Sequence, residues 1–176
     1  DGGLDCDDTE ATTYPGAPES ANDDVDSDCD GADYAADQLS VGDLVITEIM
    51  YDPEAVTDDV GEWFEVQNTS GHVLNLVGLV IADDGDYGAD DTSTVSEALI
   101  VAADARVVFG NSGSTADNGG VAMDYVYSGV AMALNNSGDD IYLGSSSGGS
   151  ITTIDVVEYL EDVAGGDFPE AKGRSI

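Results

Sequence analysis

The residues best suited to chemistry lie in an acidic stretch near the start of the chain. Residues 23–37 contain seven aspartates. Counting from Asp26, carboxylates occupy the first, third and fifth positions, a glycine the sixth, and another aspartate the twelfth. Alternating oxygen ligands followed by a sharp glycine turn allow a twelve-residue loop to wrap a hard cation. The spacing therefore predicts a calcium site formed by Asp26, Asp28, Asp30 and Asp37.

This loop has EF-hand spacing, with two departures from the usual pattern. Ala32 falls at the seventh position, where such loops use a backbone carbonyl as ligand. Asp37 replaces the usual glutamate at position twelve, and Asp33 occupies the eighth position, which is normally apolar. Because a shorter acid reaches a bidentate geometry less easily, we expect lower calcium affinity or relaxed selectivity.

The first residues of the chain repeat part of this pattern. Asp1 and Gly2 fit the fifth and sixth positions of a second loop, and Asp8 fits the twelfth. Calcium would offset the repulsion among so many neighbouring carboxylates. The alternative is a solvated acidic tail. The additional candidate ligands are Asp1, Asp5, Asp7, Asp8 and Asp24.

The whole segment resembles the acidic metal-binding repeats of large secreted bacterial proteins, known as the MopE type. The shared features are DCDD at residues 5–8, PGA at residues 15–17 followed by Glu19, and DSDCDG at residues 26–31. The likeness covers roughly residues 1–37 and implies metal binding. Calcium suits these oxygen ligands better than magnesium, which demands stricter geometry, or zinc and copper, which prefer nitrogen and sulfur ligands.

Cys6 and Cys29 are the only cysteines, and each lies between two aspartates. Neighbouring carboxylates disfavour the thiolate and therefore disfavour redox catalysis. A disulfide would close a loop of about two dozen residues, contribute roughly 3 kcal/mol and join the two acidic clusters. It would also imply an oxidising, extracellular compartment. A reduced pair in a cytosolic protein is the alternative.

The charge of the chain limits its partners. Its 176 residues carry 38 acids against three bases, a formal net charge of −35. Binding phosphate requires Lys and Arg, so we expect no nucleic acid partner. The sequence has no run of about 18 apolar residues, so we expect no insertion into a membrane. Divalent cations or high salt should offset the repulsion within the folded chain.

The elements that position these acids follow from the hydrophobic residues, which make up 41% of the chain. They gather after residue 40 in β-branched and aromatic runs bounded by turn residues. We predict an all-β sandwich of about seven to nine strands at residues 41–176, preceded by residues 1–40 as an acidic calcium-binding repeat. The predicted strands lie at 44–51, 62–68, 76–83, 98–110, 121–129, 140–145 and 151–159, with hairpin turns at 67–73 and 143–151.

The order of these runs resembles the lamin tail domain. The matching motifs are VITEIMYDP, EWFEVQNTSG, LNLVGLVIADD, LIVAADARVVF, ALNNSGDDIYL, GGSITTIDVVEY and FPEAKGRSI, which span roughly residues 42–176. The resemblance implies an immunoglobulin-like β-sandwich. It also implies a non-catalytic accessory module of secreted or surface proteins, although fold alone assigns no function.

Acids within the β region form further candidate metal groups, for which a solvated loop is the alternative. A carboxylate buried within a strand, such as that of Glu48 or Glu65, needs a cation or hydrogen bonds. Asp139 and Asp140 flank another turn. The candidate ligands are Glu48, Asp52, Asp58 and Glu62 between the first two strands, and Asp84 and Asp86 on a later loop.

Other side chains suggest modification or sugar binding more than catalysis. Asn68 and Asn135 begin N-glycosylation sequons. His72, the lone histidine, follows a Ser-Gly turn and is expected to be exposed. No nucleophile elbow, phosphate loop or metal-hydrolase motif occurs, so we predict no enzymatic activity. Trp63 and the tyrosines would form either a sugar-binding platform or part of the core.

Two functions remain in competition. The first is a non-catalytic, secreted calcium-binding structural module that self-associates into an extracellular or cell-surface assembly, such as a filament. A chain that opens within a calcium loop and stops at GRSI would leave metal ligands and a sheet edge for another copy. The second is an adhesion or glycan-binding module of a larger secreted protein.

Overall fold

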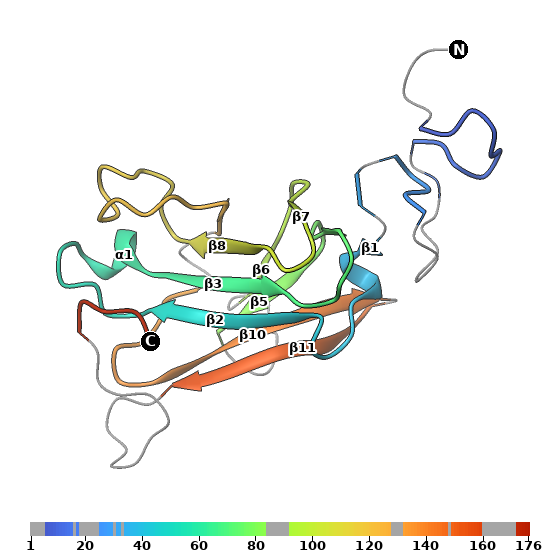
Figure 1. The fold of residues 1–176 in the computed structure, drawn as a ribbon. Coiled ribbons are helices and arrows are strands. Elements are labelled where there is room, and N and C mark those ends of the chain that lie inside the picture. The colour runs from blue at the N-terminus through green and yellow to red at the C-terminus, as the bar shows by residue number, and fades with distance from the viewer. Residues whose placement is uncertain are drawn as a thin grey trace.

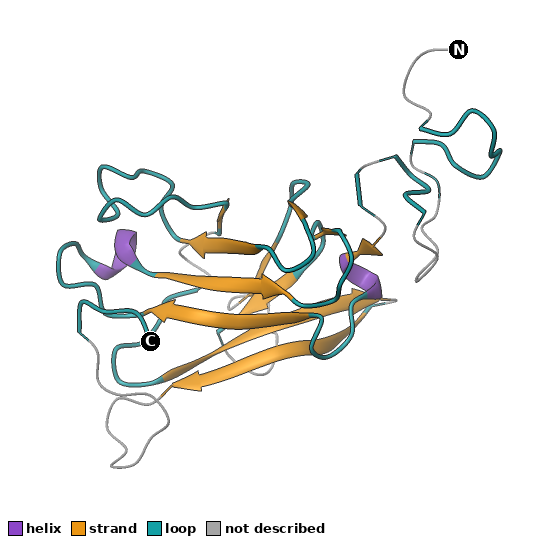
Figure 2. Cartoon of the chain, viewed as in Figure 1, coloured by secondary structure: helices purple, strands orange, loops and turns teal. Residues whose placement is uncertain are grey.

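The computed structural model describes residues 6–15, 17, 25–29, 31–32, 34–83, 92–127, 132–147, 149–159 and 172–176. Within these residues, strands carry the body of the molecule (Figure 1), and the predicted all-β class is confirmed. Among the described residues, helix is confined to the 3₁₀ turn η1 (Ala36–Gln38) and the single turn α1 (Asp58–Gly61), drawn in purple in Figure 2. No helix in the described ranges is long and apolar enough to cross a membrane.

Two sheets of four strands form the sandwich. The first sheet has the order β2 (Leu44–Met50), β3 (Trp63–Asn68), β8 (Arg106–Gly110) and β9 (Tyr125–Val126). The second has the order β11 (Ser150–Tyr159), β10 (Asp139–Ser147), β5 (Val80–Ala82) and β6 (Thr92–Thr94). All neighbours are antiparallel except the β8–β9 pair.

A third, smaller sheet joins the acidic segment to the sandwich. It has the order β1 (Tyr34–Ala35), β4 (Leu74–Asn75) and β7 (Ile100–Val101), with β1 parallel to β4. Tyr34, Ala36 and Leu39 are buried in the main core cluster. The acidic repeat, predicted to end at residue 40, thus contributes core residues to the sandwich from residue 34 onward.

The core follows the two-residue alternation of the strands. In β3, Phe64 and Val66 are fully buried, whereas Glu65 between them is only partly covered. Phe64 stacks on Phe109 of β8, with ring centroids 5.2 Å apart. Burying a ring of this size stabilises the fold by roughly 1.5–3 kcal/mol. The aromatic and β-branched residues that favour strands therefore also supply the packing.

Several strands are shorter than the runs that predicted them. The run at 98–110 divides into β7 and β8, because Ala102–Ala105 forms a turn in which Asp104 adopts a positive φ of 63°. The hairpin at 143–151 is confirmed, since Ser147 pairs with Ser150.

The hairpin predicted at residues 67–73 is wrong. β3 pairs with β2 and β8, whereas β4 pairs with β1 and β7, so the chain changes sheets at this point. Asn68 holds the corner, because its amide nitrogen donates hydrogen bonds to the carbonyls of His72, Val101 and Ala102 at 2.8–3.0 Å.

Candidate metal-binding segment

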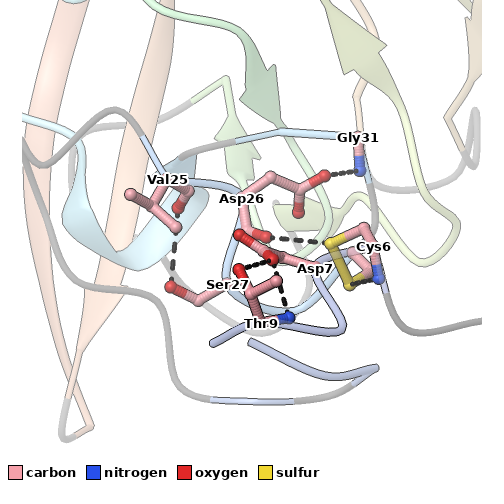
Figure 3. The surroundings of a disulfide bond; sticks show 8 residues. Cys6, Asp7, Thr9, Val25, Asp26, Ser27 and Gly31 are labelled. Atoms are coloured by element: carbon pink, nitrogen blue, oxygen red, sulfur yellow. Dashed lines mark hydrogen bonds between the residues drawn. A yellow bond between two sulfur atoms is a disulfide. The ribbon is translucent and has the colours of Figure 1, made fainter. Parts of the chain in front are cut away.

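A disulfide closes the acidic segment, which confirms the prediction made from the two cysteines of the sequence. Cys6 and Cys29 are bonded, with their Cα atoms 5.6 Å apart (Figure 3). The backbone N–H of Cys6 also donates to Cys29 Sγ at 3.0 Å. A second link comes from Tyr14, whose backbone N–H donates to the carbonyl of Ser27 at 2.8 Å. These contacts hold the two acidic clusters beside each other without a hydrophobic core of their own.

The loop that begins at Asp26 has the turn that its glycine predicted. The backbone N–H of Gly31 donates to Asp26 Oδ2 at 3.0 Å. Gly31 has a φ of 98°, which side chains other than glycine rarely tolerate. The contact joins the first and sixth positions of the predicted loop. Asp26 and Asp28 are both partly buried there.

The first acidic cluster contains a structured carboxylate next to the disulfide. Asp7 Oδ1 accepts hydrogen bonds from the backbone N–H of Thr9 at 2.9 Å and from its hydroxyl at 2.6 Å (Figure 3). These two bonds lower the pKa of Asp7 below its ordinary value. The group is therefore fully ionised at neutral pH, in the state that a calcium ligand requires.

The remaining predicted ligands are either exposed or lie outside the described residues. Asp8 and Asp37 are exposed. In the ranges that the structure covers, no three His, Cys, Asp or Glu side chains are placed together to hold a metal ion. The predicted ligands that lie outside the described residues are Asp1, Asp5, Asp24, Asp30, Asp84 and Asp86.

The candidate ligands of the first two strands have different partners, and the structure does not show them as one group. Glu48 accepts a hydrogen bond from the hydroxyl of Ser175. Asp52 is 8% exposed and lies 3.6 Å from Lys172 Nζ. Both acids thus bind the C-terminal segment, whose Ile176 exchanges two backbone hydrogen bonds of 2.9 Å with Ile49 of β2.

Asp58 and Glu62 instead contact the loop that precedes β10. Asn136 Nδ2 donates to Asp58 Oδ2, and the backbone N–H of Leu134 donates to Glu62 Oε2, both at 3.1 Å. Glu62 is only 3% exposed. Its burial, with smaller contributions from nearby Asp58, Asp139 and Asp59, raises the pKa of its carboxyl from 4.5 to about 8.

Sequence reasoning did not identify four polar residues near Glu62. The amide oxygens of Asn111 and Asn136 and the hydroxyls of Tyr127 and Tyr159 are buried without a hydrogen-bond partner. The signal available in the sequence is the NNSGDD run at residues 135–140, in which Asn136 stands beside the candidate acids Asp139 and Asp140. Nothing in the sequence marks the two tyrosines, because each lies in an ordinary strand pattern.

Two predictions on single side chains need correction. Asn68 is not a glycosylation site in this fold, because it is fully buried and its amide nitrogen is bonded to three carbonyls. His72 is partly buried rather than exposed, and its ring stacks on Tyr34 with centroids 4.6 Å apart. Asn135 is exposed, so glycosylation there stays a prediction.

An open pocket of about 190 Å³ lies beside the partly buried Trp63. Its walls include Pro53, Val56 and Val121, and it is more apolar than polar. Such a surface suits the apolar face of a sugar or a single side chain of a partner.

Two family models match the chain. The Lamin Tail Domain model matches residues 38–160, and the model of a MopE-type metal-binding motif, whose name refers to copper, matches residues 5–33. No characterised protein matches the sequence. The sandwich, its core and its strand order account for the longer match, and the disulfide-closed acidic segment accounts for the shorter one. Because the longer match covers well over half of the residues, the chain belongs to the lamin tail domain family and carries the metal-binding motif on the N-terminal side of that domain.

Proposed function

We propose that this chain is a non-catalytic, secreted structural module whose N-terminal segment binds calcium. The observation that carries the proposal is the turn between Asp26 and Gly31. The disulfide holds this turn next to the acidic residues around Asp7. A segment of this kind has no large apolar core, so a disulfide and a bound metal are the natural means of ordering it. The disulfide supports the proposed secreted location, because disulfides persist in oxidising surroundings.

Calcium fits the donor atoms of the segment better than copper does. Copper favours imidazole and thiolate ligands. Both cysteines are oxidised, and the lone histidine, His72, lies outside the motif against Tyr34. What the motif offers is carboxylate and carbonyl oxygen, the ligand set of calcium.

The position of the segment suggests what its metal does. Ala32 and Tyr34 are 2% and 6% exposed, and β1, which occupies the ninth and tenth positions of the loop, pairs with β4. A cation that orders residues 26–37 would therefore stiffen the connection into the sandwich. We propose that this rigid, acidic end bridges neighbouring copies through shared cations, which gives an extracellular or cell-surface assembly such as a filament.

Calorimetry on the full oxidised chain tests the calcium site. Calcium should bind with measurable heat, and the double variant Asp26→Asn/Asp28→Asn should lose the part of that binding that the N-terminal loop provides. A control with the same loss of charge is Glu97→Gln/Asp104→Asn, which removes two exposed acids from the sandwich and should keep it. Equal calcium binding by both double variants would refute the assignment. If Cu²⁺ bound more tightly than calcium and this binding depended on Asp26 and Asp28, the metal assigned to the site would be copper.

A second candidate function, glycan binding, rests on the pocket beside Trp63. An apolar aromatic surface with a few polar neighbours suits a sugar ring. The test is a glycan array with the full chain and with Trp63→Ala. Binding that the substitution abolishes would favour an adhesion module. No binding by either protein would leave the structural role.

A further inference from the structure

Three loops meet at the end of the sandwich where α1 leads into β3. Figure 1 shows α1 and the loop that follows β8 at the same end of the molecule. Asn111 Nδ2 donates to the carbonyl of Asp58 at 2.8 Å, and Asn136 Nδ2 donates to the Asp58 carboxylate at 3.1 Å. The backbone N–H of Leu134 donates to the Glu62 carboxylate, also at 3.1 Å. Residues far apart in the sequence are thus joined around two acids one helical turn apart.

The charge at this junction is not balanced by the bases that the structure describes. Glu62 is nearly fully buried, and three further acids, Asp58, Asp59 and Asp139, act on its carboxyl. The ion pairs seen among the described residues join Arg106 to Glu65 and Lys172 to Asp52, and neither includes Glu62. A buried carboxylate without a compensating charge strongly destabilises a fold. Such a group must either hold a proton or meet a cation.

Buried polar atoms point to the second outcome. The amide oxygens of Asn111 and Asn136 are buried and accept no hydrogen bond from the part of the chain that the structure describes. The same holds for the hydroxyls of Tyr127 and Tyr159, whose residues are 2% and 1% exposed. Burial raises the pKa of both phenols, and the Glu62 charge contributes to each shift. A lone protonated carboxyl has a single O–H to donate and could satisfy at most one of the two amide oxygens.

The available atoms select a hard divalent cation. Carboxylate and amide oxygens are the ligands that calcium prefers, completed by backbone carbonyls and water. Over the described ranges no three acids are grouped as metal ligands, so the asparagine oxygens have to complete the set. The tyrosine hydroxyls would donate to water molecules bound to the ion or to the carboxylate oxygens.

We propose that the sandwich binds its own calcium ion, held by the side chains of Asp58, Glu62, Asn111 and Asn136. This ion is separate from the one proposed for the N-terminal segment. By joining the loops before β3, after β8 and before β10, it would tie together the two main sheets at one end of the sandwich. The site does not depend on the function proposed for the acidic segment.

Terbium, which replaces calcium and is excited by nearby tyrosines, tests this site. The full chain carries Asp26→Asn/Asp28→Asn in every sample, so that the N-terminal loop contributes no signal. In that background, we expect saturable terbium luminescence that excess calcium displaces. Adding Glu62→Gln, which keeps the shape of the side chain, should weaken binding at least about tenfold, a loss of about 1.4 kcal/mol. Adding the exposed-site control Glu97→Gln should leave the affinity unchanged.

Asn136→Ala provides a second variant that leaves both acids in place. It should also weaken terbium binding while near-UV circular dichroism remains that of the folded chain. The melting temperature provides an independent measurement, because calcium should raise it in the Asp26→Asn/Asp28→Asn background and not after Glu62→Gln is added. Equal affinity in the Glu62→Gln and Glu97→Gln proteins, or no saturable signal at all, would overturn the proposal. A protonated Glu62 without metal would then be the explanation.

Discussion

Three glutamates show how the surroundings decide the role of one residue type. Glu48 accepts the Ser175 hydroxyl, and Glu65 lies 3.2 Å from Arg106 Nε and accepts the Thr47 hydroxyl at 2.7 Å. Both lie mid-strand, and both obtain the hydrogen bonds that their position predicted. Glu62 is more deeply buried, and its carboxylate accepts a hydrogen bond from the backbone N–H of Leu134. Of these three glutamates, it is therefore the one whose charge costs the folded state most.

When a chelator is present, the cost of burying the Glu62 charge should appear as a pH dependence of the free energy of unfolding. Because the pKa of Glu62 is raised from 4.5 to about 8, the folded chain binds more protons than the unfolded chain between these values. The free energy of unfolding should therefore fall as the pH rises through this window, by up to a few kcal/mol. Around the carboxyl, Asp58, Asp59 and Asp139 repel its charge and Tyr127 stays neutral.

Urea denaturation with EDTA at pH 5 and pH 9 measures this effect. Glu62→Gln should lose less stability than the unchanged chain between the two pH values, and Glu97→Gln should follow the unchanged chain. Identical pH slopes for all three proteins would mean that Glu62 does not carry the effect.

At the scale of elements, the acidic segment and the sandwich are stabilised by different forces. The sandwich has a continuous apolar core from Tyr34 to Tyr159. The segment before it relies on a disulfide, backbone turns and glycine conformations. A substitution in the acidic segment should therefore affect calcium binding more than the stability of the sandwich. A substitution in the sandwich should do the opposite.

Two glycines with the same backbone strain test this separation. Gly31 has a φ of 98° and Gly149 a φ of 85°, and a Cβ on either would meet no neighbouring atom. Gly31→Ala should therefore cost only the strain of the left-handed conformation, about 1–2 kcal/mol. We expect calcium affinity, measured by calorimetry, to fall about fivefold or more, with little change in the melting temperature of the sandwich.

Gly149→Ala, in the β10–β11 hairpin, should do the reverse and lower the melting temperature while sparing calcium affinity. The prediction fails if both substitutions weaken calcium binding alike, since the segment would then depend on the stability of the whole sandwich.

At the scale of the molecule, a net charge of −35 controls how copies approach one another. Like-charged surfaces repel, so contact between copies requires cations between them. Part of the β2 edge is already covered, since Ile176 pairs with Ile49. If copies associate as proposed, we therefore expect the contact to use the acidic segments and not that part of the sheet. Filaments would require an open head-to-tail contact, in which the acidic segment of one copy meets a different surface of the next.

Light scattering across a calcium titration measures this association. The average mass should rise with calcium and return to that of the monomer after EDTA. The Asp26→Asn/Asp28→Asn chain should stay monomeric, and the Glu97→Gln/Asp104→Asn chain should associate. A monomer at every calcium concentration, in low and in high salt, would instead favour the adhesion module.

The sequence by itself determined the features that depend on near neighbours. Strand positions follow from alternating β-branched and aromatic residues, as in β3, and the Gly31 turn follows from the spacing after Asp26. The disulfide was predictable because only two cysteines exist. The tertiary structure decided what depends on distant contacts. It buried Asn68 as a corner between sheets, and it brought Asn136 to Asp58 across 78 residues. Local patterns contain no information on such contacts, because they form only when the sheets pack.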